Sequence, residues 1–203
     1  MAVVVKSEVN SNAAVIKSLP KMHRSIATYI KYYERVVPLV LCDNIINYGF
    51  NFQASTYSTH SGRTETSEER VRMEEVWIKK GNLYYDDIRA AYGYTIKQYS
   101  QDNPLFSVQH ITDFRLNRYT EGGFMSEHVD NIHHSHGQQY GYPQVSALLY
   151  PNDDYEGGEF FVAEHQYLPR KGSAIVFPSN FMYPHEAKAV TKGTRWSIVT
   201  WLM

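Results

Sequence analysis

Hydrophobic and polar positions follow two different periods along this chain, and the change comes near its middle. Residues 39–46 and 82–101 repeat apolar side chains at helical spacing. Pro38 stands where the first segment begins, and Asn103-Pro104 follows the second. Because proline suits the start of a helix and stops one that precedes it, the pattern predicts two amphipathic helices.

From residue 106 onwards apolar and polar residues alternate, and short apolar runs follow one another between turns. The strand-like runs are FSVQHITDFRLNRYT, QVSALLYPN, GGEFFVAE, GSAIVFPS and TRWSIVTWLM. In the first half VRMEEVWIKK also predicts a strand, residues 1–20 a tail or edge strand, and the polar residues 51–70 an exposed loop or short hairpin. Helices followed by many short strands favour a mostly β (α+β) fold, a barrel or jelly roll with N-terminal helices packed outside.

Length and composition limit the protein class. The 203 residues fit one domain, 1–203, with 1–109 as an N-terminal helical support region and 110–203 as the jelly-roll core. A net charge of -1 argues against nucleic-acid and anionic-membrane binding. No run approaches a membrane span of about 18 apolar residues, and the N-terminal apolar run breaks at Lys6, too early for a signal peptide. The single Cys42 excludes an intrachain disulfide and favours a reducing, cytoplasmic location.

The candidate chemistry lies in the second half. His128-Val129-Asp130 is followed at a distance by His185, and then by Arg195. Two histidines and one carboxylate are the ligand set of non-haem Fe(II) oxygenases. Residues i and i+2 of a strand share a face, so His128 and Asp130 can bind one ion. An arginine one strand beyond the last ligand can hold the far carboxylate of a keto acid.

Three further histidines, His133, His134 and His136, crowd the same region. A His-rich tract can bind metal loosely without catalysis, and His128 could belong to it. However, adjacent strand residues point to opposite faces, and the Gly-Gln-Gln-Tyr-Gly run that follows predicts a loop. We therefore expect these three to be loop residues near the mouth of the site, and not ligands.

Residues 110–203 resemble the Fe(II)/2-oxoglutarate dioxygenases, specifically the prolyl 4-hydroxylase-like branch. The residues that support this resemblance are Arg118-Tyr119, Gly122-Gly123, His128-Val129-Asp130, the run Leu149 to Phe160, Gly172, Phe177-Pro178, His185-Glu186-Ala187, Gly193 to Ser197 and Trp201. A weaker similarity lies at Val37-Pro38, Cys42-Asp43 and Ile45-Ile46.

The resemblance implies a double-stranded β-helix with iron and 2-oxoglutarate inside the barrel mouth. It implies that His128, Asp130 and His185 bind Fe(II), that Arg195 binds the C5 carboxylate of 2-oxoglutarate, and that Tyr119 assists Arg195. O2 would be the second cosubstrate and ascorbate an optional reductant, and succinate and CO2 would be released. Because related halogenases have glycine or alanine at the carboxylate position, Asp130 argues for hydroxylation.

Two departures bear on the substrate. Many related prolyl hydroxylases have lysine at the position of Arg195, and the usual Arg-x-x-Thr pattern after Asp130 is replaced by Pro143-Gln144-Val145-Ser146. The leading substrate is a prolyl residue in a peptide or protein. The alternatives are a small molecule such as a free amino acid, or a catalytically silent metal-binding jelly-roll module. The sequence leaves the oligomeric state open.

Other candidate residues have two interpretations. Alternation puts Ser197 on the same face as Arg195, where it either binds the cosubstrate carboxylate or is an ordinary strand serine. Tyr140 and Tyr142 are candidate contacts to a proline ring, in one of two polar loops, Tyr57–Arg70 and His133–Tyr142, expected at the barrel entrance. The bulky side chains of Trp196 and Trp201 predict packing, and Gly157-Gly158 predicts a tight turn before a strand.

Overall fold

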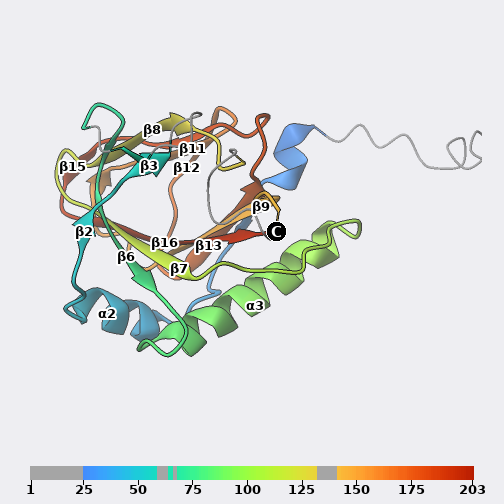
Figure 1. Cartoon of the computed structure of the whole chain (residues 1–203), viewed down its shortest axis with the longest axis horizontal. Helices are drawn as coiled ribbons and strands as arrows, with labels where there is room; N and C mark the ends of the chain where they lie inside the picture. The colour runs from blue at the N-terminus through green and yellow to red at the C-terminus, as the bar shows by residue number, and fades with distance from the viewer. Residues whose placement is uncertain (1–24, 59–63, 66–67, 132–140) are drawn as a thin grey trace, which may run out of the picture.

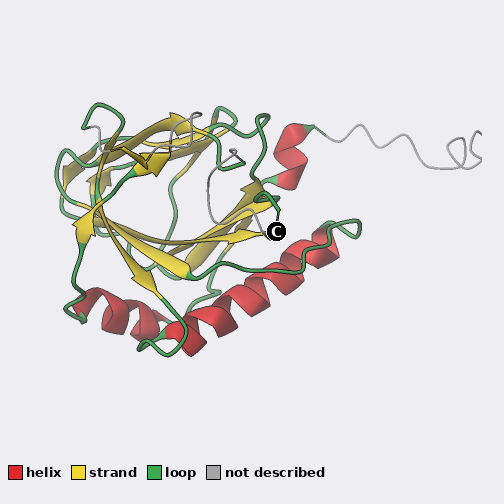
Figure 2. Cartoon of the chain, in the orientation of Figure 1, coloured by secondary structure: helices red, strands yellow, loops and turns green. Residues whose placement is uncertain are grey.

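Two antiparallel β-sheets face each other, and two helices cover the outer face of the larger sheet (Figures 1 and 2). This computed structural model describes residues 25–58, 64–65, 68–131 and 141–203. The helical elements are the 3-10 turn η1 (Ile26–Tyr29), α2 (Leu39–Asn47) and α3 (Tyr85–Asp102). The expected tail over residues 1–20 lies outside the described residues.

Every paired strand in the described ranges is antiparallel. The seven-stranded sheet has the order β1 (Lys31–Tyr33), β13 (Ser173–Pro178), β9 (Val145–Tyr150), β16 (Arg195–Leu202), β7 (Phe114–Tyr119), β6 (Glu74–Ile78) and β2 (Gln53–Ala54). The five-stranded sheet has the order β12 (His165–Tyr167), β11 (Phe160–Val162), β14 (His185–Ala187), β8 (Phe124–His128) and β5 (Val71–Arg72). Two small ribbons pair β10 (Glu156–Gly157) with β15 (Val190–Lys192), and β3 (Tyr57–Ser58) with β4 (Thr64–Glu65).

Alternation along β16 divides its side chains between two hydrophobic cores. Trp196 and Ile198 belong to the core between the seven-stranded sheet and the helices. Val199 and Trp201 belong to the core between the two sheets. The space between the sheets is therefore reached by every second residue of β16, starting with Arg195, and this is where the candidate site lies.

The expected fold, a mostly β jelly roll with helices outside, is confirmed. Helix α3 begins later than the pattern predicts, because Tyr84 adopts a left-handed conformation with φ 66° just before it. The first predicted strand run forms a strand only at Phe114–Tyr119, since residues 109–112 instead follow the C-terminal end of the chain through backbone hydrogen bonds. Within the described residues, no helix is long and apolar enough to cross a membrane.

Residues before 105 also contribute strands that their pattern did not predict. Strand β1 extends the seven-stranded sheet at one edge and pairs with β13, and β2 extends it at the other edge beyond β6. The VRMEEVWIKK run forms two strands, β5 and β6, which join different sheets. These strands are short, and edge pairing of short segments depends on distant partners that local sequence does not reveal.

Candidate metal and cosubstrate site

His128 and His185 lie directly opposite each other on the neighbouring strands β8 and β14, with ring centroids 4.2 Å apart. The Nδ1 atom of His128 is 2.9 Å from the backbone oxygen of Ser126, and Nδ1 of His185 is 3.2 Å from that of Tyr183. If each Nδ1 carries the proton and donates it to its carbonyl, each Nε2 keeps a lone pair for a metal ion.

Asp130 completes the cluster from a bend beyond the end of β8. Its two carboxylate oxygens lie 3.6 Å from Nε2 of His128 and 3.3 Å from Nε2 of His185. Ligands of a first-row metal at about 2.1 Å, placed at right angles, stand about 3 Å apart, so the three side chains fit one divalent ion. Among the described residues they form the one group of at least three such ligands whose atoms lie within 4.8 Å of one another.

Strand alternation, the reason given from sequence for pairing His128 with Asp130, is not what orients the aspartate, because β8 ends at His128. The orientation comes from β9 and the end of β13. The hydroxyl of Ser146 donates to Oδ2 of Asp130 at 2.6 Å, and it is 2.7 Å from the hydroxyl of Ser179. This contact comes from the segment that replaces the Arg-x-x-Thr pattern.

The protonation states suit cation binding. Burial acts to raise the pKa of Asp130, but the adjacent His185 and His128 outweigh it and hold the pKa of that carboxyl well below its ordinary value. Burial and the neighbouring His185 lower the pKa of His128. The cluster thus presents an ionised carboxylate beside an imidazole that favours its neutral, ligating form.

We expect Ser146→Ala to weaken divalent-metal binding by about 10- to 100-fold, the usual range when a hydrogen bond to a ligating group is lost. Competition titration against a chelating dye would measure it. Ser173→Ala is the matched control, because Ser173 is another fully buried serine of this sheet and its hydroxyl has no partner among the described residues. Equal metal affinity in the Ser146 variant and the parent would contradict the role.

Arg195 is buried between aromatic rings at the start of β16, with 1% of its surface exposed. Its guanidinium carbon lies 4.8 Å from the ring centre of Tyr119, its cross-strand neighbour, and 5.4 Å from that of Tyr150. Within the described ranges none of its three guanidinium nitrogens has a hydrogen-bond partner. A buried cation without an anion is costly, so this arginine is suited to an anionic ligand.

Gly158 leaves the room that Arg195 occupies. A Cβ atom at this position would lie 2.9 Å from Cδ of Arg195, and its φ of +64° is one that other residues rarely adopt. The tight turn expected at Gly157-Gly158 is not formed, because Gly157 belongs to β10 and the chain continues into β11 along the same antiparallel neighbour, with both glycines at positive φ. The second glycine therefore also shapes the site.

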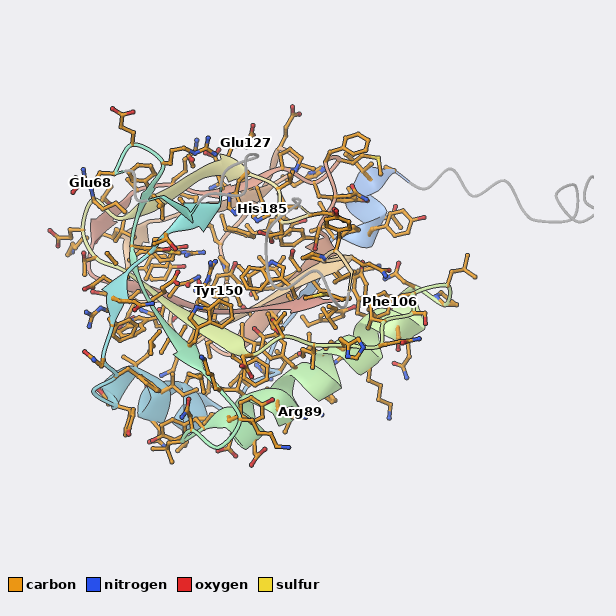
Figure 3. The ribbon with its side chains drawn as sticks, in the orientation of Figure 1. Glu68, Arg89, Phe106, Glu127, Tyr150 and His185 are labelled. Atoms are coloured by element: carbon orange, nitrogen blue, oxygen red, sulfur yellow. The ribbon has the colours of Figure 1, made fainter. Side chains whose placement is uncertain are left out.

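One pocket joins the metal-ligand cluster to Arg195. It is lined by Arg115, Asn117, Tyr119, Met125, His128, Asp130, Leu148, Phe160, His185, Ala187, Arg195, Val199 and Trp201. Figure 3 labels His185 and Tyr150, which come from the two facing sheets. The ring centroid of Phe160 lies 6.0 Å from that of His185 and 6.3 Å from that of Tyr150. The hydroxyl of Tyr150 and Oδ1 of Asn117 are buried without a hydrogen-bond partner among the described residues.

The sequence did not single out Arg115, Asn117 or Tyr150 as site residues. Asn117 and Arg115 share the alternating face of Tyr119 on β7, which is a signal that could have found them. Tyr150 lies on β9, where every residue is buried, so alternation does not separate its two faces.

The remaining candidates are less central. Ser197 is buried and accepts a 3.4 Å hydrogen bond from Nδ2 of Asn117, so it contacts a pocket residue and does not itself line the pocket. Trp196 packs in the core under the helices, whereas Trp201 both packs and lines the pocket. Tyr142 is 42% exposed.

Tyr140 and the three loop histidines, His133, His134 and His136, lie outside the described residues, as do 59–63 and 66–67 of the Tyr57–Arg70 segment. Within that segment β3 and β4 form a short hairpin, one of the two forms expected.

Comparisons with known proteins relate part of the chain to one oxygenase superfamily. Residues 114–203 match the family model of the 2OG-Fe(II) oxygenase superfamily, which confirms the resemblance expected from sequence. Human prolyl 3-hydroxylase 2 is 44% identical over 69 residues, covering 30% of this chain and 10% of that protein. The chain thus spans about a tenth of the length of this curated relative.

Solved structures show the same fold at low sequence identity. A Pseudomonas putida prolyl-4-hydroxylase superimposes with a TM-score of 0.66 at 18% identity, over 86% of this chain and 91% of that one. A Trichoplax adhaerens prolyl hydroxylase, solved with a hypoxia inducible factor peptide fragment, gives 0.68 at 16% identity, over 87% and 84%.

Proposed function

We propose that this chain, whose residues 114–203 match the 2OG-Fe(II) oxygenase superfamily, is a 2-oxoglutarate-dependent dioxygenase that hydroxylates a prolyl residue in a peptide or protein. The observation that supports it most is the pairing, in one pocket, of a His-Asp-His cluster with a buried arginine that has no hydrogen-bond partner among the described residues. A structural metal would not require that arginine, which argues against a silent binding module.

The side chains divide the work between them. His128, Asp130 and His185 would hold Fe(II) on one face, and Ser146 keeps the carboxylate in place. Arg195 would hold the far carboxylate of 2-oxoglutarate, with the phenols of Tyr119 and Tyr150 beside it as further hydrogen-bond donors. When bound, iron and 2-oxoglutarate supply the oxygen activation that protein side chains cannot. The apolar walls, Leu148, Phe160 and Val199, exclude water from the reacting centre.

The prolyl substrate is supported by the relatives. Human prolyl 3-hydroxylase 2 is 44% identical over 69 residues, and two prolyl hydroxylases share the fold, one of them in complex with a peptide. A cytoplasmic location belongs to the proposal as well, because a reducing compartment suits both ferrous iron and the unpaired thiol of Cys42.

We expect purified protein supplied with Fe(II), 2-oxoglutarate and ascorbate to add one oxygen atom to a proline-containing peptide, with one succinate released per hydroxylation. Mass spectrometry of a peptide library and of free amino acids would measure it, and alanine-for-proline peptides are the control. Oxidation of a free amino acid alone would favour the small-molecule alternative. Metal binding with no succinate formed from any substrate would favour the silent module.

A further inference from the structure

A second arginine, Arg115, lines the same pocket from another position. It stands on β7 four residues before Tyr119, about 13 Å along the strand, and pairs across the sheet with Val199. Alternation puts Arg115, Asn117 and Tyr119 on the inner face of β7. Arg195 pairs with Tyr119, so the two arginines enter the pocket at separate points.

The surroundings of Arg115 differ from those of Arg195 because Arg115 has an acidic partner. Its Nη1 atom lies 3.7 Å from Oε2 of Glu75, and both side chains are largely buried, at 12% and 8% exposure. The Glu75 carboxylate is itself held by the hydroxyl of Ser55 at 2.7 Å and by Nε1 of Trp77 at 3.3 Å. The guanidinium lies over the ring of Trp201 at 4.9 Å. Glu75 and Trp201 therefore hold the Arg115 side chain in place, and the carboxylate of Glu75 compensates its positive charge.

Arg115 still has hydrogen-bond donors to offer. Its contact with Glu75 is too long for a hydrogen bond, and its Nε is buried without a partner among the described residues. A carboxylate bound here would bring a second negative charge close to Glu75 in a site largely shielded from water, which is unfavourable. A neutral carbonyl oxygen accepts the same hydrogen bonds without adding charge.

We propose that Arg115 is a specificity-determining residue that donates to a peptide carbonyl oxygen of the substrate. The inference rests on the proposed function and refines it, because it assigns Arg195 and Arg115 to different ligands, one to the cosubstrate and one to the substrate. Uncompensated Arg195 takes the carboxylate of the cosubstrate, and compensated Arg115 takes the neutral carbonyl beside the reacting residue. Free proline presents a carboxylate at that position, so Arg115 favours a prolyl residue within a peptide.

The test compares Arg115→Gln with Arg118→Gln. Arg118 is on the same strand but faces away from the pocket, where it pairs with Glu74 and lies over Phe52. Substrates are a peptide with one proline and an amidated C terminus, and free L-proline. We expect the peptide KM to rise about 10- to 100-fold in Arg115→Gln, the range for a lost hydrogen bond to a charged group. The KM for 2-oxoglutarate should stay at the parent value, and Arg118→Gln should match the parent in both.

Calorimetric titration of peptide into protein loaded with Mn(II) and 2-oxoglutarate measures peptide affinity for the same variants without turnover.

Glu75→Gln removes the charge that compensates Arg115 and should shift the substrate preference from the peptide towards free proline. Arg115→Met, which keeps the apolar stem on Trp201, replaces Arg115→Gln if thermal melting shows that variant unfolded.

A parent-like peptide KM and affinity in the folded Arg115 variant overturn the inference. A rise in the KM for 2-oxoglutarate in place of the peptide KM also overturns it, because Arg115 would then be a cosubstrate ligand. If the parent enzyme oxidises neither peptide nor proline, it is the proposed function that fails.

Discussion

Replacing His185 by alanine should abolish metal-dependent turnover, the largest effect expected for a single side chain in this protein. His185 supplies the Nε2 atom nearest to the Asp130 carboxylate, and its other nitrogen lies against a backbone carbonyl. Among the described residues, no further histidine, cysteine or carboxylate belongs to this cluster. Loss of a hydrogen bond behind a ligand typically weakens metal binding about 10- to 100-fold, and loss of the ligand itself should exceed the upper figure. Mn(II) titration followed by electron paramagnetic resonance would measure affinity, and succinate formation would measure turnover.

The matched control is His165→Ala. His165 is an exposed histidine in the same five-stranded sheet, on β12, and it is not part of the ligand cluster. That variant should bind metal and turn over like the parent. If His185→Ala does so too, the assignment of the metal site is wrong.

Replacing Arg195 by alanine should reduce affinity for 2-oxoglutarate by about 2–5 kcal/mol, the usual cost of removing one member of a buried charge pair. The Arg195 guanidinium lies beside Tyr119 and is positioned to bind the C5 carboxylate of 2-oxoglutarate. The other arginine of the pocket, Arg115, is four residues away from Tyr119 along β7. Arg195→Lys should lose less, because lysine keeps the charge but not the bidentate geometry. Tyr119→Phe should cost only about 1 kcal/mol, for one hydrogen bond. Calorimetric titration with Mn(II)-loaded protein would rank the four proteins.

Thermal melting gives an independent readout for the same arginine. Without ligand, Arg195 is a buried cation that has no hydrogen-bond partner in the described part of the chain. Arg195→Met removes that charge without leaving a large cavity and should melt at or above the temperature of the parent. Added 2-oxoglutarate should raise the melting temperature of the parent and leave that of Arg195→Met unchanged. An equal rise in both proteins would show that 2-oxoglutarate binds elsewhere.

The pocket contains two kinds of electrostatic site, one at each arginine. At Arg195 the described residues provide a cation without a hydrogen-bonded anion, so the ligand has to supply the anion. At Arg115 the protein provides both charges, so the ligand contributes only an acceptor. The same residue type therefore has different ligand preferences, and the difference lies in a glutamate from a neighbouring strand.

The sequence by itself determined the two helices, the longer strands and the residue types of the chemistry. Helical spacing predicted α2 and α3, and alternating or short apolar runs between turns predicted the longer strands β7, β9, β13 and β16. The ligand set could be recognised from the identity and order of its residues alone: a His-x-Asp pair, a later histidine and then an arginine. Neither property depends on how the chain folds. Local periodicity also placed Arg195 and Ser197 on one face of β16 and Trp196 on the other. Arg195 lines the pocket and Trp196 packs under the helices, but Ser197 does not line the pocket.

Only the tertiary structure decided which residues support that chemistry. Ser146 reaches Asp130 because Asn131, the next residue, donates hydrogen bonds to the backbone oxygens of Ser179 and Pro143, which hold the end of β8 against β13 and β9. The pairing of β9 with β13 brings the hydroxyl of Ser179 to Ser146. Glu75 reaches Arg115 because β6 pairs with β7 in one particular register, and the ring of Trp201 reaches it because β16 pairs on the other side. Strand pairing and register are set by contacts between distant segments, and the local pattern that predicts a strand is the same whichever partner it finds.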